Sequence, residues 1–126
     1  MDRRELLNLC LAFPGAYEDY PFKDSGLAVV RHLKNRKVFA WVYLKAEKLY
    51  ISLKEEPMRA EFWRRVYPGV SPGYHLNKQH WNTVDLACAP PLQDLLTMIK
   101  NSHALTAPKP KAPPSAPRRQ RKKAEK

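Results

Sequence analysis

The chain has 126 residues, of which 44% are hydrophobic, and it carries a formal net charge of +11 at pH 7. This length and composition suit one domain with a modest hydrophobic core. No apolar run is long enough to span a membrane, and residues 1–15 are charged where a signal peptide is apolar, so we expect a cytoplasmic protein. Cys10 and Cys88 lack the spacing of a zinc or redox motif, and we expect both to be buried.

The positive charge is concentrated near the C-terminus. Residues 107–126 hold eight Lys or Arg and one Glu, a net charge of +7, which leaves +4 for residues 1–106. Five of the twelve prolines lie in the same segment, which has no aromatic or large aliphatic residue. Such a segment cannot bury a core. We therefore expect a folded domain over residues 1–106 and a disordered Pro/Lys/Arg-rich tail over residues 107–126.

The first expected element is a helix that begins near Asp2. Asp2 and Glu5 have the spacing of a capping box, and apolar residues then recur on one helical face as far as Phe13. Pro14 ends this helix. Residues 16–24 mix acidic and aromatic side chains too irregularly for assignment, and an edge strand there stays open.

Three antiparallel strands are expected next, over residues 27–33, 38–44 and 49–53. A turn over residues 34–37 joins the first two strands, and Asn35 is its expected left-handed residue. Along the second strand an aliphatic set of side chains alternates with an aromatic set. The aliphatic set is expected to pack on helices. The opposite face would then present Phe39, Trp41, Tyr43 and, from the third strand, Tyr50.

This aromatic face, which lies beside basic residues, is a candidate platform for stacking nucleobases. Stacking on aromatic side chains of a sheet contributes about 1–3 kcal/mol per base. The candidate stacking residues are Trp41, Tyr43 and Tyr50. The alternative is that these aromatic residues serve packing and are covered by the tail, by a protein partner or by a second copy of the chain.

The second half of the chain predicts a helix, two strands and a helix. Pro57 suits the first position of the first of these helices, whose apolar residues Met58, Phe62, Trp63 and Val66 are expected to face inward. A strand over residues 80–86 is expected to pair with a short one near residues 74–76, and a final helix follows residues 90–91. The sequence therefore predicts a two-layer α+β domain, with an antiparallel sheet and helices on one face, in the order α-β(3)-α-β(2)-α.

Two segments carry recognisable motifs. The run YPGV-x-PGYH-x-NK-x-HWNTV spans residues 67–84, and FPGAYEDYPF spans residues 13–22. With these two motifs in this order, over roughly residues 3–105, the chain resembles the MmcQ/YjbR family of small bacterial proteins. The resemblance implies a fold related to CyaY-like and secretion-chaperone-like folds, and it implies DNA binding.

The residues of the chain do not suggest catalysis. No P-loop, GxSxG or GxGxxG motif is present. His75 and His80 have no carboxylate or thiol companion, and the acidic cluster Glu18, Asp19 and Asp24 is more typical of an exposed loop than of a metal site. We expect a non-enzymatic protein with no cofactor, metal or small-molecule substrate. A ligand-binding role for residues 67–81 is a weaker alternative.

The basic and amide side chains of the two hairpin turns and of the tail favour DNA binding. We expect contact with duplex DNA mainly through the phosphate backbone, with low sequence specificity and an association with the nucleoid. The main alternative is a protein-interaction adaptor or homodimer that uses the aromatic face. The candidate nucleic-acid contacts are Lys34, Asn35, Arg36, Lys37, Asn77, Lys78, His80, Asn82, Arg118, Arg119, Arg121, Lys122 and Lys123.

Overall fold

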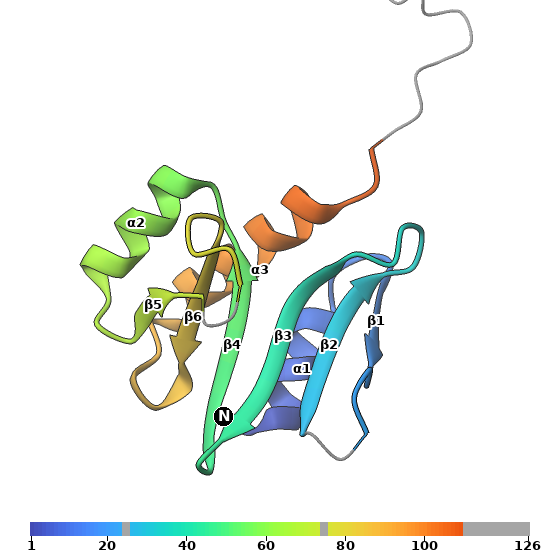
Figure 1. Cartoon of the computed structure of the whole chain (residues 1–126), viewed down its shortest axis with the longest axis horizontal. Helices are drawn as coiled ribbons and strands as arrows, with labels where there is room; N and C mark the ends of the chain where they lie inside the picture. Colours follow the sequence, from blue (N-terminus) through green and yellow to red (C-terminus); the bar gives the residue numbers. More distant parts are fainter. Residues whose placement is uncertain (24–25, 74–75, 110–126) are drawn as a thin grey trace, which may run out of the picture.

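A computed structural model describes residues 1–23, 26–73 and 76–109 (Figure 1). The helices are α1 (Arg3–Leu11), α2 (Pro57–Val66) and α3 (Leu92–Thr106), with a 3₁₀ turn η1 (Leu86–Cys88). The strands are β1 (Ala16–Asp19), β2 (Leu27–His32), β3 (Val38–Lys45), β4 (Lys48–Lys54), β5 (Val70–Pro72) and β6 (Trp81–Asp85). They form one sheet in the order β1-β2-β3-β4-β6-β5, in which all neighbours are antiparallel.

The predicted two-layer α+β architecture is confirmed. Helix α1 packs on β1, β2 and β3, α3 packs on β3 and β4, and α2 packs on β5 and β6. In Figure 1, α1 and α3 lie behind the sheet. Among the described residues, none of the helices combines the length and the hydropathy that crossing a membrane requires.

Two strands differ from the expected set. The irregular segment after the first helix supplies a fourth strand, β1, at the edge of the sheet, where it pairs with β2. The short partner of β6 lies at Val70–Pro72, earlier than expected, because Val70 is buried in the core and pairs with Val84. Residues 74–75 of the expected strand lie outside the described residues.

The hydrophobic core lies between the sheet and the helices. The predicted capping box at the start of α1 is present, since Asp2 and Glu5 each accept a hydrogen bond from the other's backbone N–H. This cap fixes the start of the helix whose buried side chains include Cys10. Cys88, in contrast, is exposed, so the expectation that both cysteines are buried is wrong for Cys88. The largest fully buried core side chains are Phe39, Leu6, Leu7, Ile51, Leu95, Ile99, Val30, Val42 and Val84.

A β-bulge in β3 changes the expected alternation. Val30 pairs with Ala40, whereas Arg31 pairs with Val38, so Phe39 is the extra residue. The Phe39 ring is fully buried on the helix side of the sheet, with its centroid 5.0 Å from that of His103 in α3. The prediction that Phe39 lies on the aromatic face is therefore wrong, because a bulge reverses the alternation that the prediction assumed.

Helix α2 is rotated relative to the prediction. Ala60 and Trp63 are its buried residues, whereas Met58 is 87% exposed, and Phe62 and Val66 are also exposed. The rotation is fixed by a hydrogen bond in which the Trp63 indole Nε1 donates to the buried Glu55 carboxylate at 3.0 Å. Because α2 packs mainly on the two short strands β5 and β6, a narrow row of side chains suffices for its packing.

Candidate nucleic-acid interface

The turn between β2 and β3 presents three exposed cationic side chains, which are Lys34, Arg36 and Lys37. Within the described residues, none of the three lies within 4 Å of a carboxylate, since the two ion pairs found there join Arg4 to Glu18 and Arg31 to Asp19. The positive charge of this turn is therefore not neutralised by a neighbouring carboxylate. A polyanion is the type of partner that such a surface suits.

Hydrogen bonds fix the conformation of this turn. Arg36 adopts the left-handed conformation, with a φ angle of 61°, so the expectation that Asn35 does so is wrong. The Asn35 side chain instead accepts a hydrogen bond from the Lys37 backbone N–H at 2.9 Å, and its Nδ2 donates to the Thr106 carbonyl at 3.0 Å. Arg31 Nη1 donates to the Arg36 carbonyl at 2.9 Å. Asn35 thus positions the turn through both ends of its amide, and the side chains of Lys34, Arg36 and Lys37 remain exposed.

The Asn35 bond joins the basic turn to the C-terminal end of α3, where the basic tail begins. A second contact supports it, because His32 Nε2 lies 2.8 Å from Thr106 Oγ1. Burial lowers the pKa of His32, and the nearby His103 lowers it further, which favours the neutral ring in this contact. Figure 1 shows the end of α3 beside the β2–β3 turn. The described start of the tail therefore lies next to three of the candidate DNA contacts.

The loop between β5 and β6 lies at the same end of the sheet as the β2–β3 turn, because the strands alternate in direction. Asn77 and Lys78 are exposed, and Asn77 Oδ1 accepts from the Gln79 backbone N–H at 3.0 Å. His80 is half-buried, and its carbonyl accepts from the Glu55 N–H at 2.8 Å. Lys78 is therefore the exposed cation of the described part of this loop.

Arg64 of α2 holds this loop in place, a role that the sequence did not reveal. Its Nη2 donates to the Lys78 carbonyl and to the Trp81 carbonyl, the latter at 3.3 Å. Its Nε donates to Asn82 Oδ1 at 2.6 Å. These partners lie 14 to 18 residues further along the chain, so no local pattern connects them to Arg64.

Asn82 is a structural residue, so its assignment as a DNA contact is wrong. It is only 3% exposed and lies in β6 opposite Leu53, on the helix side of the sheet. Besides accepting from Arg64, its Nδ2 donates to the Ala60 carbonyl at 3.1 Å. Asn82 therefore links β6 to α2, and it is buried too deeply to reach a phosphate.

We expect Asn82→Ala to lower the free energy of unfolding by about 1–3 kcal/mol, because it leaves the Ala60 carbonyl and one Arg64 donor without their partner. Urea denaturation measures this loss. The matched control is Asn77→Ala, at an exposed turn position, with an expected loss below about 1 kcal/mol. Equal stability of the two variants would contradict the structural role of Asn82.

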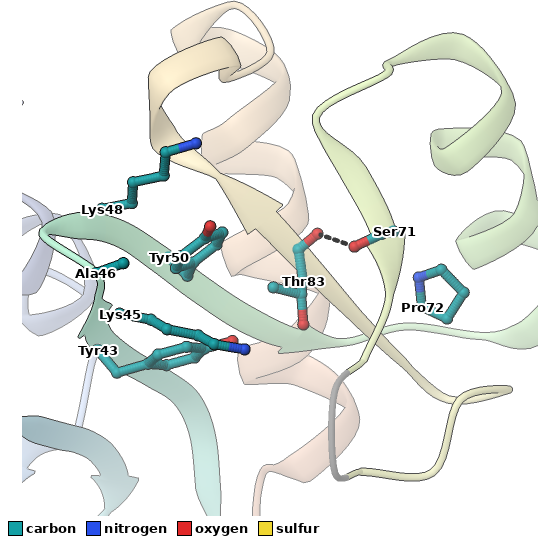
Figure 2. Close-up of a pocket in the computed structure, with 8 residues that line it drawn as sticks. All are labelled: Tyr43, Lys45, Ala46, Lys48, Tyr50, Ser71, Pro72 and Thr83. Carbon is teal, nitrogen blue, oxygen red and sulfur yellow. Dashed lines mark hydrogen bonds between the residues drawn. The ribbon is translucent and has the colours of Figure 1, made fainter. Parts of the chain in front are cut away.

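The open face of the sheet brings two of the three candidate stacking residues together. Tyr43 and Tyr50 pair directly across β3 and β4, and their rings are stacked with centroids 5.5 Å apart. Both line a groove of about 360 Å³ (Figure 2). Trp41 lies on β3 two residues before Tyr43, opposite Ser52, and it does not line this groove. Its indole Nε1 is buried without a hydrogen-bond partner among the described residues.

The acidic cluster of the β1 region is held in ion pairs. Arg4 Nη1 lies 2.7 Å from Glu18 Oε1, and this hydrogen bond lowers the pKa of Glu18 to about 2. Arg31 Nε lies 2.8 Å from Asp19 Oδ2. The described residues contain no group of three or more side chains that could hold a metal ion. Asp24 and His75 lie outside the described part of the chain.

The tail candidates also lie outside the described residues, which end at residue 109. These candidates are Arg118, Arg119, Arg121, Lys122 and Lys123. Among the candidate contacts in the described residues, the exposed ones are Lys34, Arg36 and Lys37 on one turn and Asn77 and Lys78 on the other.

The architecture is that of a small α+β domain with a six-stranded antiparallel sheet, helices on one face and two basic projections at one end. Comparison with known proteins identifies this class. The chain belongs to the YjbR family, whose model matches residues 11–105.

The relatives cover most of the folded part. The uncharacterised protein YjbR of Escherichia coli K12 is 32% identical over 108 residues, which cover 79% of this chain and 81% of the relative. A crystal structure of a Pseudomonas syringae protein matches with a TM-score of 0.75 and 28% identity, over 84% of this chain and 99% of that protein. A crystal structure of a Deinococcus radiodurans protein matches with a TM-score of 0.71 and 33% identity, over 81% and 75% of the respective chains. The family and the fold are thus shown.

Proposed function

We propose that this protein binds duplex DNA mainly through the phosphate backbone, with low sequence specificity and without catalytic activity. One observation carries the proposal. The turn that holds Lys34, Arg36 and Lys37 in the open is tied by Asn35 to the end of α3, where the basic tail begins. The three cationic side chains of the turn and the start of a segment of net charge +7 therefore lie at the same end of the molecule.

Phosphate contacts of this kind favour binding through the release of counterions. Each phosphate neutralised on duplex DNA adds about 0.9 to the slope of log affinity against log salt concentration. Residues 1–106 carry +4 of the net charge against +7 for the tail, so the folded domain supplies orientation and the smaller part of the affinity. The tail supplies the larger, sequence-independent part. This role belongs in the cytoplasm, at the nucleoid.

The tail is tested by replacing Arg118, Arg119, Arg121, Lys122 and Lys123 with Gln in the full chain. We expect the salt slope of duplex binding to become shallower by up to about 4.5, because five phosphate contacts are lost. Fluorescence anisotropy of a labelled duplex at several salt concentrations measures the slope. The matched control replaces Gln120 with Ala, which leaves the charge intact. An unchanged slope would contradict a role for the tail in DNA binding.

A second candidate function is a protein-interaction adaptor or homodimer that docks through the aromatic face. One observation favours it, which is that α1, α2 and α3 all pack on the other side of the sheet. A second copy of the chain would occupy the groove at Tyr43 and Tyr50, so chemical shifts of the groove that depend on protein concentration distinguish a homodimer from a nucleotide bound there.

A further inference from the structure

We infer that the groove on the open face of the sheet binds an unpaired nucleotide of single-stranded nucleic acid, with the base stacked on Tyr43 and Tyr50 and a phosphate held by Lys48. The inference rests on the proposal that this protein binds nucleic acid, and it extends the ligand from paired to unpaired strands. The two sites use different surfaces, so each can fail without the other.

The groove lies between the β3–β4 hairpin and the short strand β5. Figure 2 shows the side chains that line it, with Tyr43 and Tyr50 on one side and Ser71 and Pro72 on the other. Its volume of about 360 Å³ lies at the lower end of the range typical of ligand sites, about 300–1,000 Å³. A groove of this volume has room for one small ligand group, and its open sides leave a path for the rest of a nucleic-acid strand.

The two tyrosine rings form a prepared stacking surface. They come from directly opposed residues of β3 and β4, and the planes of the rings are 21° apart. Both residues are half-buried, so each ring is held by its neighbours while part of it remains exposed. Aromatic rings fixed on a sheet in this way stack bases with little preference for sequence.

The positive charge of the groove comes from the end of the same hairpin. Lys45 and Lys48 are directly opposed, two residues beyond the tyrosines on the same face. Ala46 and Glu47, with φ angles of 51° and 65°, make the tight turn between them, as in hairpins that match the twist of a sheet. Lys45 already interacts with another group, so Lys48 is the main candidate for the phosphate.

Two acidic residues lie near the groove. Glu47 is in the hairpin turn, and Asp85 pairs with Tyr50. Asp85 Oδ1 accepts from the Ala87 N–H at 2.9 Å, so this carboxylate caps η1. Neither residue lines the groove. The lining charge is therefore positive, as a phosphate requires.

The far wall of the groove offers hydrogen-bonding groups. Ser71 Oγ donates to the Thr83 carbonyl at 3.5 Å (Figure 2), a long bond that an incoming base edge can replace. Among the described lining residues, Ala46 and Pro72 are the only aliphatic ones. An apolar peptide would need larger anchors, so the combination of rings, a cation and a hydroxyl favours a nucleotide.

The inference is tested by nuclear magnetic resonance on the full, isotope-labelled chain. The ligand is an oligothymidylate of about ten nucleotides, within the usual site size. The control ligand is an abasic strand of equal length, which keeps the phosphates and lacks the bases. We expect shift changes at Tyr43, Tyr50 and Ser71 with the oligothymidylate, and a dissociation constant roughly 5- to 150-fold higher for the abasic strand.

Variants give the second measurement. Replacing Tyr43 and Tyr50 together with Leu is expected to weaken oligothymidylate binding as far as the abasic strand does, whereas Phe at both positions retains the rings and the affinity. Lys48→Gln, which is exposed and leaves the rings unchanged, is expected to make the salt slope shallower by about 0.7. This variant keeps the inference testable if the Leu variant fails to fold.

The inference is overturned if the abasic strand binds equally well, or if the shift changes are confined to residues 34–37 and 78. Groove shifts that depend on protein concentration, without any oligonucleotide, overturn it in favour of a homodimer. Duplex binding is measured in parallel. Groove shifts without duplex binding overturn only the proposed duplex function, and duplex binding without groove shifts overturns only the inference.

Discussion

Duplex DNA binding is expected to weaken roughly 100- to 1,000-fold near 0.1 M salt when Lys34, Arg36 and Lys37 are all replaced by Glu, because each phosphate contact is worth about 0.9 decade at that concentration. The three side chains are exposed and lie within 4 Å of no carboxylate in the described part of the chain, so in the proposed mode of binding the substitutions remove direct contacts with DNA. The salt slope is expected to become shallower by up to about 2.7. Anisotropy titrations at several salt concentrations measure both quantities.

A matched control variant separates the effect of where the charges lie from the effect of the total net charge. Lys23, Arg65 and Lys100 are also exposed, and they lie outside both basic turns and the tail. Their replacement by Glu changes the net charge of the protein by the same amount. We expect this control to keep most of the affinity, because long-range charge effects are screened beyond about 10 Å at this salt concentration. Equal losses in the two variants would show that only net charge matters.

The second large effect is expected in stability, at Glu55. This residue is 4% exposed, and its carboxylate accepts three hydrogen bonds that join three parts of the fold. Oε1 accepts from Trp63 Nε1 and from Asn101 Nδ2, both at 3.0 Å, and Oε2 accepts from the Glu56 N–H at 3.2 Å. Glu55→Ala leaves these donors unpaired and removes side-chain volume. We expect the free energy of unfolding to fall by about 2–4 kcal/mol.

Urea denaturation of Glu55→Ala and of Glu55→Gln tests this role. Gln retains the Oε1 acceptor for Trp63 and Asn101, so we expect the loss in the Gln variant to be less than half of that in the Ala variant. A loss below about 0.5 kcal/mol for Glu55→Ala would show that the three hydrogen bonds contribute little.

The sequence predicted the parts of this fold that depend on local chemistry. The capping box at Asp2 and Glu5, the start of a helix at Pro57 and the strand over residues 49–53 each involve residues a few positions apart, and each is found in the structure. The order of helices and strands follows from them. The irregular sequence of residues 16–24 does not distinguish a loop from an edge strand, and the pairing of β1 with β2 in the structure identifies a strand.

The errors arise where distant contacts override local pattern. Phe39 reaches the core through a bulge that depends on the register of β2, and the rotation of α2 depends on a hydrogen bond between Trp63 and Glu55. Asn82 is polar and lies in a motif rich in turn residues, which suggested an exposed position. Its burial depends on Arg64 and Ala60, about twenty residues earlier in the chain.

The sequence also predicts only the local features of the candidate site. A turn rich in lysine and arginine is normally exposed, and Lys34, Arg36, Lys37 and Lys78 are exposed in the structure. The contact between Asn35 and the end of α3 had no local signal, since 71 residues separate the two groups. This contact places the start of the tail at the end of the domain that carries the β2–β3 turn.

The bond from Asn35 to Thr106 has a consequence for the strength of binding. In the proposed mode, the folded turn and the tail act as two linked ligands for one polyanion. Once the turn has engaged a stretch of backbone, the tail meets neighbouring phosphates at a high effective concentration, so the two parts gain avidity from their common anchor. Moving the tail to the opposite end of the domain would preserve every charge and forfeit that gain.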